Sequence, residues 1–389
     1  MNKTAKIFKK YTKYIFENKI LTVPVAVLIF LGIVSAIVWR LSVSYVQIAD
    51  FFTGTVSFVL RFILTRATHF LPFSLAEFML FTSAPVIIYL IAKFIYNIVR
   101  AKRAGKTRPA VLLKGIFRII AFCGYVMFIF TFTLGVCYGK TPVNEKMDFE
   151  RRPLETEELS SAMKILTGEI NKIAGNIEHV DFETGSTIMP YSLDELNKKL
   201  NDAYKNMLDK YDLFIRINSK VKPVILSEQL SKMHITGIYS FFSGEANVNI
   251  GFPDYNLPFT AAHEMAHLMG VGREDEANFV AFLVCMHSGD DYIRYSGLVN
   301  MSEYIRNALV EADISAYFNA VADMPVIVIN EWTAFSKFYD KYRNTKISKV
   351  ASAANDAYLM AQGQKHGVRS YGLVVDLATV YLIELYENN

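Results

Sequence analysis

The chain has 389 residues, of which 52% are hydrophobic and 14% aromatic. Its mean hydropathy is positive, which excludes an ordinary soluble domain of this size. The net charge of +4 is modest and says little about partners, because the positive charge is clustered near apolar runs; we expect no nucleic-acid partner. The three cysteines (Cys123, Cys137 and Cys285) follow no metal or disulfide spacing.

Three apolar segments before residue 140 are predicted to span a membrane. Residues 20–39 and 119–139 contain no charged residue, and residues 78–99 contain only Lys93. Each segment is long enough to cross a hydrocarbon core of ~30 Å. Residues 20–39 also lack the cleavage pattern of a signal peptide, so we expect a retained anchor. The alternative, buried core helices of a soluble protein, fits poorly with these lengths.

Basic residues predict the orientation of the chain. Six lysines precede the first segment, and seven lysines and arginines lie in residues 100–118, but only Arg40, Arg61 and Arg66 separate the first two segments. The positive-inside rule therefore predicts a cytoplasmic N-terminus and an extracytoplasmic region after residue 139. The aromatic loop 41–76 is expected to lie along the outer membrane surface or to pack over the spans.

Residues 141–389 differ in composition and are predicted to form one α+β domain after a membrane region of residues 1–140. Apolar residues at helical spacing occur in the segment 154–177, where we expect the helix to end at Gly175. They also occur in residues 192–214, which open with Ser192 and Glu195 in a capping-box arrangement. Segments 222–228 and 235–252 are rich in β-branched and aromatic residues and are predicted strands. Further helices are expected at 257–287, with a break at Gly270–Gly272, and at 302–317, 331–342 and 373–386.

The sequence His263-Glu264-Met265-Ala266-His267 is an H-E-x-x-H motif. On a helix, histidines at positions i and i+4 project from one face, so both imidazoles can bind one zinc ion. Glu264 lies beside them and can take a proton from a zinc-activated water. The surrounding residues are apolar almost all round, which predicts a buried helix. Buried, unpartnered imidazoles and a carboxylate would cost several kcal/mol, and a bound cation removes that cost.

Zinc in a catalytic site needs a third protein ligand. Gly270 and Gly272 can end the helix and turn the chain back, so a second helix is expected to start near Arg273. Glu274 is the first choice for the third ligand, because it shares a face of small residues with Asn278. Asn278 is then placed to hydrogen-bond a ligand histidine. Glu276 is the alternative ligand, because the phase of the second helix is not fixed by the sequence.

Other interpretations of these residues remain open. The histidines could be hydrogen-bonded core residues, and the glutamates could compensate the positive N-terminus of a helix. A di-iron carboxylate site needs two E-x-x-H motifs, whereas only one occurs, at Glu264–His267.

The motif pair H-E-x-x-H and E-x-x-A-N resembles the glutamate-zincin metallopeptidases, in which the first glutamate of the second motif is a ligand. The longer run "FFSGEANVNIGFPDYNLPFTAAHEMAHLMGVGREDEANFVAFL" is more similar to a family of bacterial membrane proteins, domain-of-unknown-function family thirty-eight-ten. That family also has N-terminal spans, "PFS" before a span and "SYG..VDL" near the end, here Ser370–Gly372 and Val375–Leu377. The resemblance covers nearly the whole chain. It implies a zincin-like, mostly helical domain with a small sheet and a zinc site, but no substrate.

Two features would suit a peptidase. Zincins bind substrate as an extra strand, and Gly244–Ile250 has the character of such an edge strand. They also place a histidine, tyrosine or arginine against the oxyanion, and Tyr371 is our choice, with Arg369 and His366 as alternatives.

The sequence therefore predicts a membrane-anchored zinc metallopeptidase that binds the lipid bilayer and a peptide or protein substrate. His263, His267 and Glu274 or Glu276 would bind Zn²⁺, with Glu264 as general base and Tyr371 on the oxyanion. The alternative is a non-catalytic zinc-binding sensor or scaffold of the cell envelope, although an intact Glu264 has no role in a purely structural site. A third hypothesis is a membrane structural protein without metal.

Overall fold

The computed structural model describes residues 12–15, 17–105, 107–343 and 345–387. Of the basic residues used for orientation, Lys3, Lys6, Lys9, Lys10 and Lys106 lie outside the described residues. The chain forms two compact units, one from residues up to Leu41 with Ala76–Phe132 and one from Ser42–Leu75 with Thr133–Asn389.

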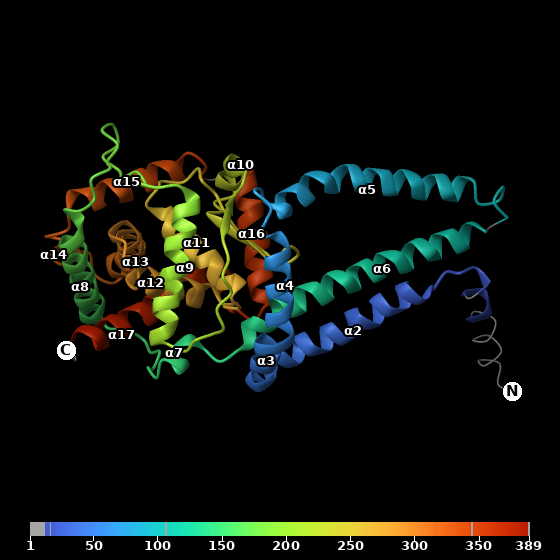
Figure 1. Cartoon of the computed structure of the whole chain (residues 1–389), viewed down its shortest axis with the longest axis horizontal. Coiled ribbons are helices and arrows are strands. Elements are labelled where there is room, and N and C mark those ends of the chain that lie inside the picture. Colours follow the sequence, from blue (N-terminus) through green and yellow to red (C-terminus); the bar gives the residue numbers. More distant parts are fainter. Residues whose placement is uncertain (1–11, 16, 106, 344, 388–389) are drawn as a thin grey trace. The chain divides into compact units, whose positions relative to one another are not determined.

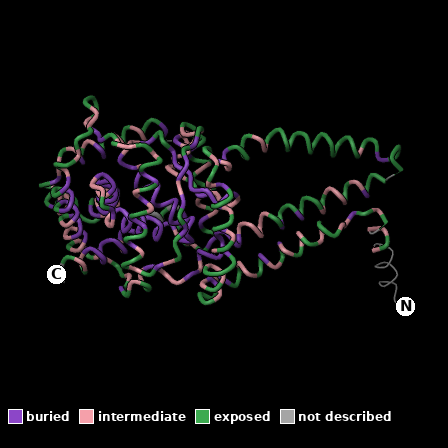
Figure 2. The backbone as a smooth tube through the Cα atoms, in the orientation of Figure 1, coloured by how far each residue is buried: buried purple, intermediate pink, exposed green. Residues whose placement is uncertain are grey.

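The first unit consists of long apolar helices: α2 (Val23–Ser44), α5 (Leu75–Val99) and α6 (Arg108–Thr133). These three helices, and the segment Val46–Thr68, are long and apolar enough to cross a membrane. Most of α5 is exposed although it is rich in isoleucine, leucine and phenylalanine (Figure 2). An apolar surface of this extent is typical of a membrane protein.

Two glycines bring α2 and α6 into backbone contact. A Cβ on Gly32 would lie 2.4 Å from Cα of Gly124, and a Cβ on Gly124 would lie 2.4 Å from the carbonyl oxygen of Leu28. Small residues at such a crossing are typical of helix pairs in membranes, because close backbone packing replaces the hydrophobic effect there.

The third membrane span was predicted to end six residues later than the helix that the structure shows there. Residues 119–139 were expected to form it, but α6 stops at Thr133 and a 3₁₀ turn, η2 (Gly135–Gly139), follows. Val136 and Cys137 are fully buried in the second unit. Residues 134–138 are therefore apolar because they pack in a protein core, and for this reason the sequence suggested a longer span.

One nearly continuous helix opens the second unit: α3 (Val46–Phe52), a π-helical turn η1 (Thr53–Ser57) and α4 (Phe58–Thr68) (Figure 1). Its buried side chains are mostly polar (Ser57, Arg61, Thr65 and Thr68). Its exposed side chains include Phe51, Val59 and Ile63. This polarity is the reverse of that of a helix on a soluble domain, in which the apolar face is buried.

The second unit contains a three-stranded sheet in the order β1-β3-β2. The strands are β1 (Val221–Pro223), β2 (Gly237–Ser240) and β3 (Glu245–Val248); β3 is parallel to β1 and antiparallel to β2. Val221 pairs with Ala246, and Tyr239 pairs with Ala246 from the other side. The prediction that residues 244–250 form the substrate-binding edge is wrong, because β3 is central and both of its edges are paired.

Helices make up most of the second unit. They are α7 (Val143–Lys146), α8 (Thr156–Ala174), α9 (Leu193–Lys210), α10 (Ser227–Lys232), α11 (Asn256–Leu268), α12 (Glu274–Met286), α13 (Asp291–Ala312), α14 (Ile314–Ala320), α15 (Val326–Asp340), α16 (Lys346–Ala361), η3 (Gly367–Leu373) and α17 (Val374–Glu387). Helix α11 packs on β2 and β3 and against α12 and α13, and α8 covers α13 (Figure 1). The expectation of an α+β protein with mostly helices and a small sheet is confirmed.

Local sequence signals set several helix ends. Ser192 caps α9 by accepting a hydrogen bond from the Glu195 backbone N–H, and α8 ends before Gly175, both as predicted. The predicted helix 302–317 is instead divided between α13 and α14. Asp313 causes the break, because its carboxylate accepts from the N–H groups of Ser315 and Ala316 and starts a new helix.

Candidate metal centre

Helix α11 carries the H-E-x-x-H motif in the centre of the second unit. Every residue from Pro258 to Leu268 is buried. The helix ends in a Schellman arrangement, in which the N–H of Val271 donates to the carbonyl of Ala266 across Gly270. Gly270 has φ of +93°, a conformation that favours glycine. This turn brings α12 back beside α11.

Three side chains converge between α11 and α12. The Nε2 atoms of His263 and His267 are 3.0 Å apart, and each lies 3.3 Å from Oε2 of Glu274. In a tetrahedral zinc site with ligand bonds of ~2.0–2.1 Å, the ligand atoms are about 3.3 Å apart. All three residues are less than 9% exposed. The ligand spacing therefore fits one zinc ion.

The histidine tautomers also fit a metal. Nδ1 of His263 lies 2.8 Å from Oδ1 of Asn278, and Nδ1 of His267 lies 2.7 Å from the carbonyl oxygen of Val271. Both partners accept hydrogen bonds, so each Nδ1 carries the proton and each Nε2 keeps a free lone pair. Two Nε2 lone pairs facing each other in a buried site need a shared proton or a cation between them.

Electrostatics in the cluster follow from burial and mutual contact. Burial lowers the pKa of His267, but the Glu274 carboxylate outweighs it and raises this pKa to about 9. Burial raises the pKa of Glu274, but the two imidazoles outweigh this effect and hold the pKa far below its usual range. A negative charge on Glu274 beside the two imidazoles therefore favours a positive species in this site.

Glu264 follows His263 on α11 and lies against strand β2 of the sheet, close enough to both histidines and to Glu274 to feel their charges. Burial raises the pKa of its carboxyl to about 7, against the opposing effect of the two histidines, and the carboxyl accepts a hydrogen bond from the Tyr239 backbone N–H. A Cβ on Gly237 would lie 2.6 Å from Oε1 of Glu264. Only a glycine in β2 therefore leaves room for this glutamate, and Glu264 faces the edge strand of the sheet.

A second layer of contacts holds the ligands. Nδ2 of Asn278 donates to the hydroxyl of Tyr304 at 3.2 Å, which links His263 through Asn278 to α13. Burial raises the pKa of Tyr304, and the charge on Glu274 adds to this effect. Sequence reasoning missed Tyr304, because no periodicity or spacing connects position 304 with position 278.

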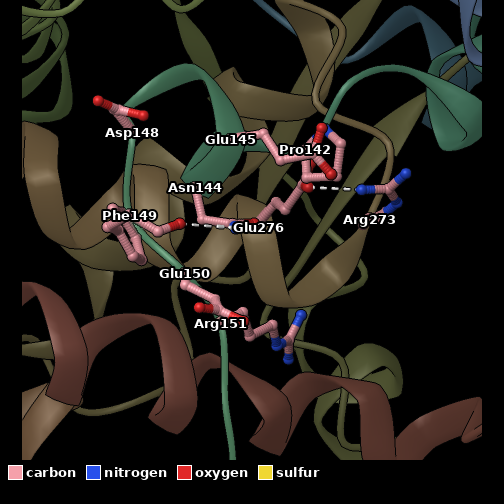
Figure 3. Close-up of a pocket in the computed structure, with 9 residues that line it drawn as sticks. All are labelled: Pro142, Asn144, Glu145, Asp148, Phe149, Glu150, Arg151, Arg273 and Glu276. Carbon is pink, nitrogen blue, oxygen red and sulfur yellow. Dashed lines mark hydrogen bonds and ion pairs between the residues drawn. The ribbon is translucent and has the colours of Figure 1, made fainter.

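The structure does not bring Glu276 to the cluster. Its Oε1 accepts from Arg273 at 2.7 Å and from the Val143 backbone N–H at 3.2 Å. Figure 3 shows Glu276 directed to Arg273 at the wall of an open cavity of about 640 Å³. Of the two glutamates considered as third ligand, Glu274 is the one that lies beside the histidines.

The residues considered for the oxyanion lie in and beside η3. His366 and Arg369 are exposed, and the side chain of Tyr371 lies outside the described residues. Element η3 contacts α12, the helix that carries Glu274. Tyr358 in α16 is a further phenol near the cluster: burial raises its pKa to about 12, and the Glu274 charge contributes. No motif or spacing in the sequence points to Tyr358.

The fold and the cluster define a mostly helical protein with apolar N-terminal helices and a buried candidate metal centre of two histidines and a glutamate. The chain belongs to the family described as protein of unknown function (DUF3810), whose sequence profile matches residues 52–379. No curated protein and no solved structure matches it. The matched region contains both motifs and the second unit almost completely.

Proposed function

We propose that the protein is a membrane-anchored zinc metallopeptidase of zincin-like fold. The observation that carries the proposal is the convergence of His263 Nε2, His267 Nε2 and Glu274 Oε2 at 3.0–3.3 Å from one another. When bound, zinc supplies the Lewis-acid chemistry that activates water and polarises a peptide carbonyl. Three protein ligands, rather than four, leave a coordination position for this chemistry.

The residues around the cluster suit peptide hydrolysis. Glu264 would take a proton from water and pass it to the leaving amine, and the Tyr239 N–H holds its carboxyl in place. The same contact puts β2, an edge strand, beside Glu264. An extended peptide can add to the outer edge of β2 by main-chain hydrogen bonds to groups other than the Tyr239 N–H, which would place its carbonyl near the cluster. β2 thus replaces residues 244–250 as the proposed substrate strand.

We keep the predicted orientation as part of the proposal, with three spans and an extracytoplasmic second unit. Val46–Thr68 is also long and apolar enough to cross a membrane. However, Thr65 donates to the carbonyl of Gly244, the residue before β3, and this contact lies within the second unit. A C-terminal alkaline phosphatase fusion should be active and a C-terminal green fluorescent protein fusion dark; the reverse result would contradict the orientation.

Metal content of the full chain in detergent tests the centre. We expect about one zinc per chain in the wild type and loss of zinc in His263→Ala and Glu274→Ala. Glu276→Gln is the matched control and should retain zinc, because Glu276 binds Arg273 instead. Absence of zinc from the wild type under zinc-replete conditions, or its retention in Glu274→Ala, would contradict the proposed site.

Hydrolysis is tested with Glu264→Gln, which preserves the size of the side chain and removes the base. The wild type should cleave members of a peptide library, scored by mass spectrometry, whereas the variant should retain zinc and lose at least about 100-fold in rate. Equal cleavage by both proteins would overturn the mechanism. One zinc per chain without cleavage would instead favour the non-catalytic sensor or scaffold, for which the near-complete burial of the cluster is the supporting observation.

A further inference from the structure

A second cavity, of about 310 Å³, lies in the second unit between the α3–α4 helix and the loops around residues 140 and 214. Its charged lining residues are Asp50, Arg61, Lys140 and Lys146, and its apolar ones include Phe58 and Phe214. The proposed peptidase function assigns no role to it. Three cations and one carboxylate make the lining positive.

The two most buried cations of this cavity's lining, Arg61 and Lys140, have no ion-pair partner among the described residues. Arg61 is 2% and Lys140 3% exposed, and neither lies within ion-pair distance of a carboxylate among the residues that the structure describes. Arg61 donates only to neutral groups: to the Ser57 hydroxyl at 3.0 Å, the Cys137 sulfur at 2.9 Å and the Thr53 carbonyl at 3.3 Å. Its Nε has no acceptor. A buried guanidinium without a counter-ion is costly, so an anion would stabilise it.

Lys140, like Arg61, is a buried cation that forms no ion pair with a described carboxylate. Its ammonium group lies 5.5 Å from the centroid of the Phe214 ring, and burial lowers its pKa to about 8. The charge of Glu276 opposes that effect through space, but this carboxylate is bound by Arg273. Lys140 therefore gains a strong partner only from a group that enters the cavity.

The other two charged residues of the lining, Asp50 and Lys146, are already hydrogen-bonded to neighbouring protein groups. Asp50 accepts from the backbone N–H of Thr141 at 2.9 Å and from its hydroxyl at 2.6 Å. Lys146 donates to the carbonyl of Leu213 at 2.7 Å. Asp50 is thus held by Thr141 and does not neutralise Arg61 or Lys140.

The wall at the π-helical turn supplies a further donor. The hydroxyl of Thr53 is buried without a partner, and a Cβ at Gly54 would meet no atom within 4 Å. π-helical turns often occur at functional sites, because they widen the helix and free backbone groups. Among the residues that line the cavity, the Arg61 Nε–H and the Thr53 hydroxyl are thus buried donors without acceptors, and Lys140 adds an ammonium group. An anion with several oxygen acceptors matches these donors.

We propose that this cavity binds a phosphate group, held by Arg61, Lys140 and Thr53. The group can belong to a lipid headgroup or to a soluble phosphate. Exposed apolar side chains on the same helix, such as Val59 and Ile63, would contact lipid tails if the source is a lipid. The Arg61 guanidinium also lies against Gly270, since a Cβ there would be 2.5 Å from Nη1. The phosphate would therefore bind behind the turn that joins the two ligand helices.

The test uses the full chain in detergent. Native mass spectrometry would measure binding of dioleoylphosphatidylglycerol, with dioleoylglycerol as a lipid of identical chains without phosphate. Thermal unfolding would compare inorganic phosphate with chloride at equal ionic strength. Lys140→Met and Thr53→Val nearly preserve side-chain volume and remove one proposed contact each, so they test the site even if an Arg61 variant does not fold. Arg66→Gln is the matched control, because Arg66 is exposed on the same helix.

We expect phosphatidylglycerol, but not dioleoylglycerol, to bind, with an affinity at least about 10-fold lower in Lys140→Met and unchanged in Arg66→Gln. If inorganic phosphate alone raises the unfolding temperature of the wild type, and Lys140→Met abolishes the rise, the source is soluble phosphate. If the wild type and Lys140→Met, or the wild type and Thr53→Val, behave alike towards both probes, the proposal is overturned. None of these outcomes depends on zinc or on hydrolysis.

Discussion

Asn278 determines which nitrogen of His263 is available to a metal. Its Oδ1 accepts the Nδ1 proton, and its Nδ2 is fixed by the hydroxyl of Tyr304. We expect Asn278→Ala to weaken zinc binding by about 10–100-fold, because the imidazole then loses its orientation. Tyr304→Phe should have a smaller effect in the same direction. Competition of the full chain with a fluorescent zinc chelator measures both.

The control for Asn278 is another buried asparagine with a structural role. The side chain of Asn197 bonds both backbone groups of Val221 in β1. Asn197→Ala should lower stability but leave zinc affinity unchanged. If Asn278→Ala behaved like Asn197→Ala, its bond to His263 would have no role in metal binding.

Glu331 provides a test that is independent of the metal centre. It is fully buried, its Oε1 accepts from the Thr187 backbone N–H at 2.8 Å, and its Oε2 has no partner. Burial raises its pKa to about 7, although the contacts with Thr187 and Tyr295 oppose this shift. Between pH ~4.5 and ~7, Glu331 is therefore protonated in the folded state but ionised in the unfolded state. The stability from this group is complete below pH ~4.5 and is lost as pH rises through ~7.

We expect Glu331→Gln to remove that pH dependence. The variant should be more stable than the wild type at pH 8 by up to about 2–3 kcal/mol, because it is never ionised, and the difference should shrink towards pH 5. Thermal unfolding of the full chain between pH 5 and 8 measures it. Glu178→Gln, at an exposed site, should show no such trend. A constant difference across this range would mean that Glu331 does not titrate there.

At the scale of elements, the turn between α11 and α12 determines whether the ligands meet. Gly270 has positive φ and packs on Arg61 with no room for a Cβ. We expect Gly270→Ala to destabilise the protein by about 1–3 kcal/mol, from backbone strain and from displacement of Arg61, and to weaken zinc binding. Scanning fluorimetry and zinc content measure these effects. Gly289→Ala is the matched control in the next turn, where a Cβ would meet nothing within 4 Å, and it should be nearly neutral.

Features set by neighbouring residues could be predicted from the sequence. The break at Gly270–Gly272 and the cap at Ser192 each depend on a few adjacent residues, and both occur as expected. The closeness of His263 and His267 follows from helical spacing. The apolar helices were also recognisable, although the third was extended to residue 139 because core and lipid-facing residues are equally apolar.

Features set by contacts distant in the chain could not be predicted. Choosing between Glu274 and Glu276 required knowing that Arg273 and the Val143 N–H bind Glu276. The central position of β3 depends on β1, more than twenty residues earlier, and periodicity carries no information about strand order. Tyr304 reaches Asn278 only because α13 packs on α12.

At the scale of the whole molecule, residues 42–75 belong to the second unit although the first unit's helices separate them from it in sequence. The Lys222 ammonium in β1 donates to the carbonyls of Thr68 at 2.8 Å and Phe73 at 3.1 Å, and it pairs with Glu245 in β3. Glu245 also accepts from the Leu75 N–H. Removing residues 42–75 would therefore take away the bonds of this buried ion pair to Thr68, Phe73 and Leu75.

We accordingly expect residues 133–389 alone to be unstable. A chain in which a flexible Gly-Ser linker joins residues 42–75 to 133–389 should unfold cooperatively. Its free energy of unfolding should be several kcal/mol higher, because loss of partners from a buried charge costs about 3–5 kcal/mol. Circular dichroism melts of the two chains measure the difference, and a scrambled 42–75 sequence on the same linker controls for added length. If residues 133–389 alone were equally stable, the contacts of Lys222 and Thr65 would contribute nothing. Val46–Thr68 would then be free to act as a fourth span, and the orientation proposed for the second unit would be reversed.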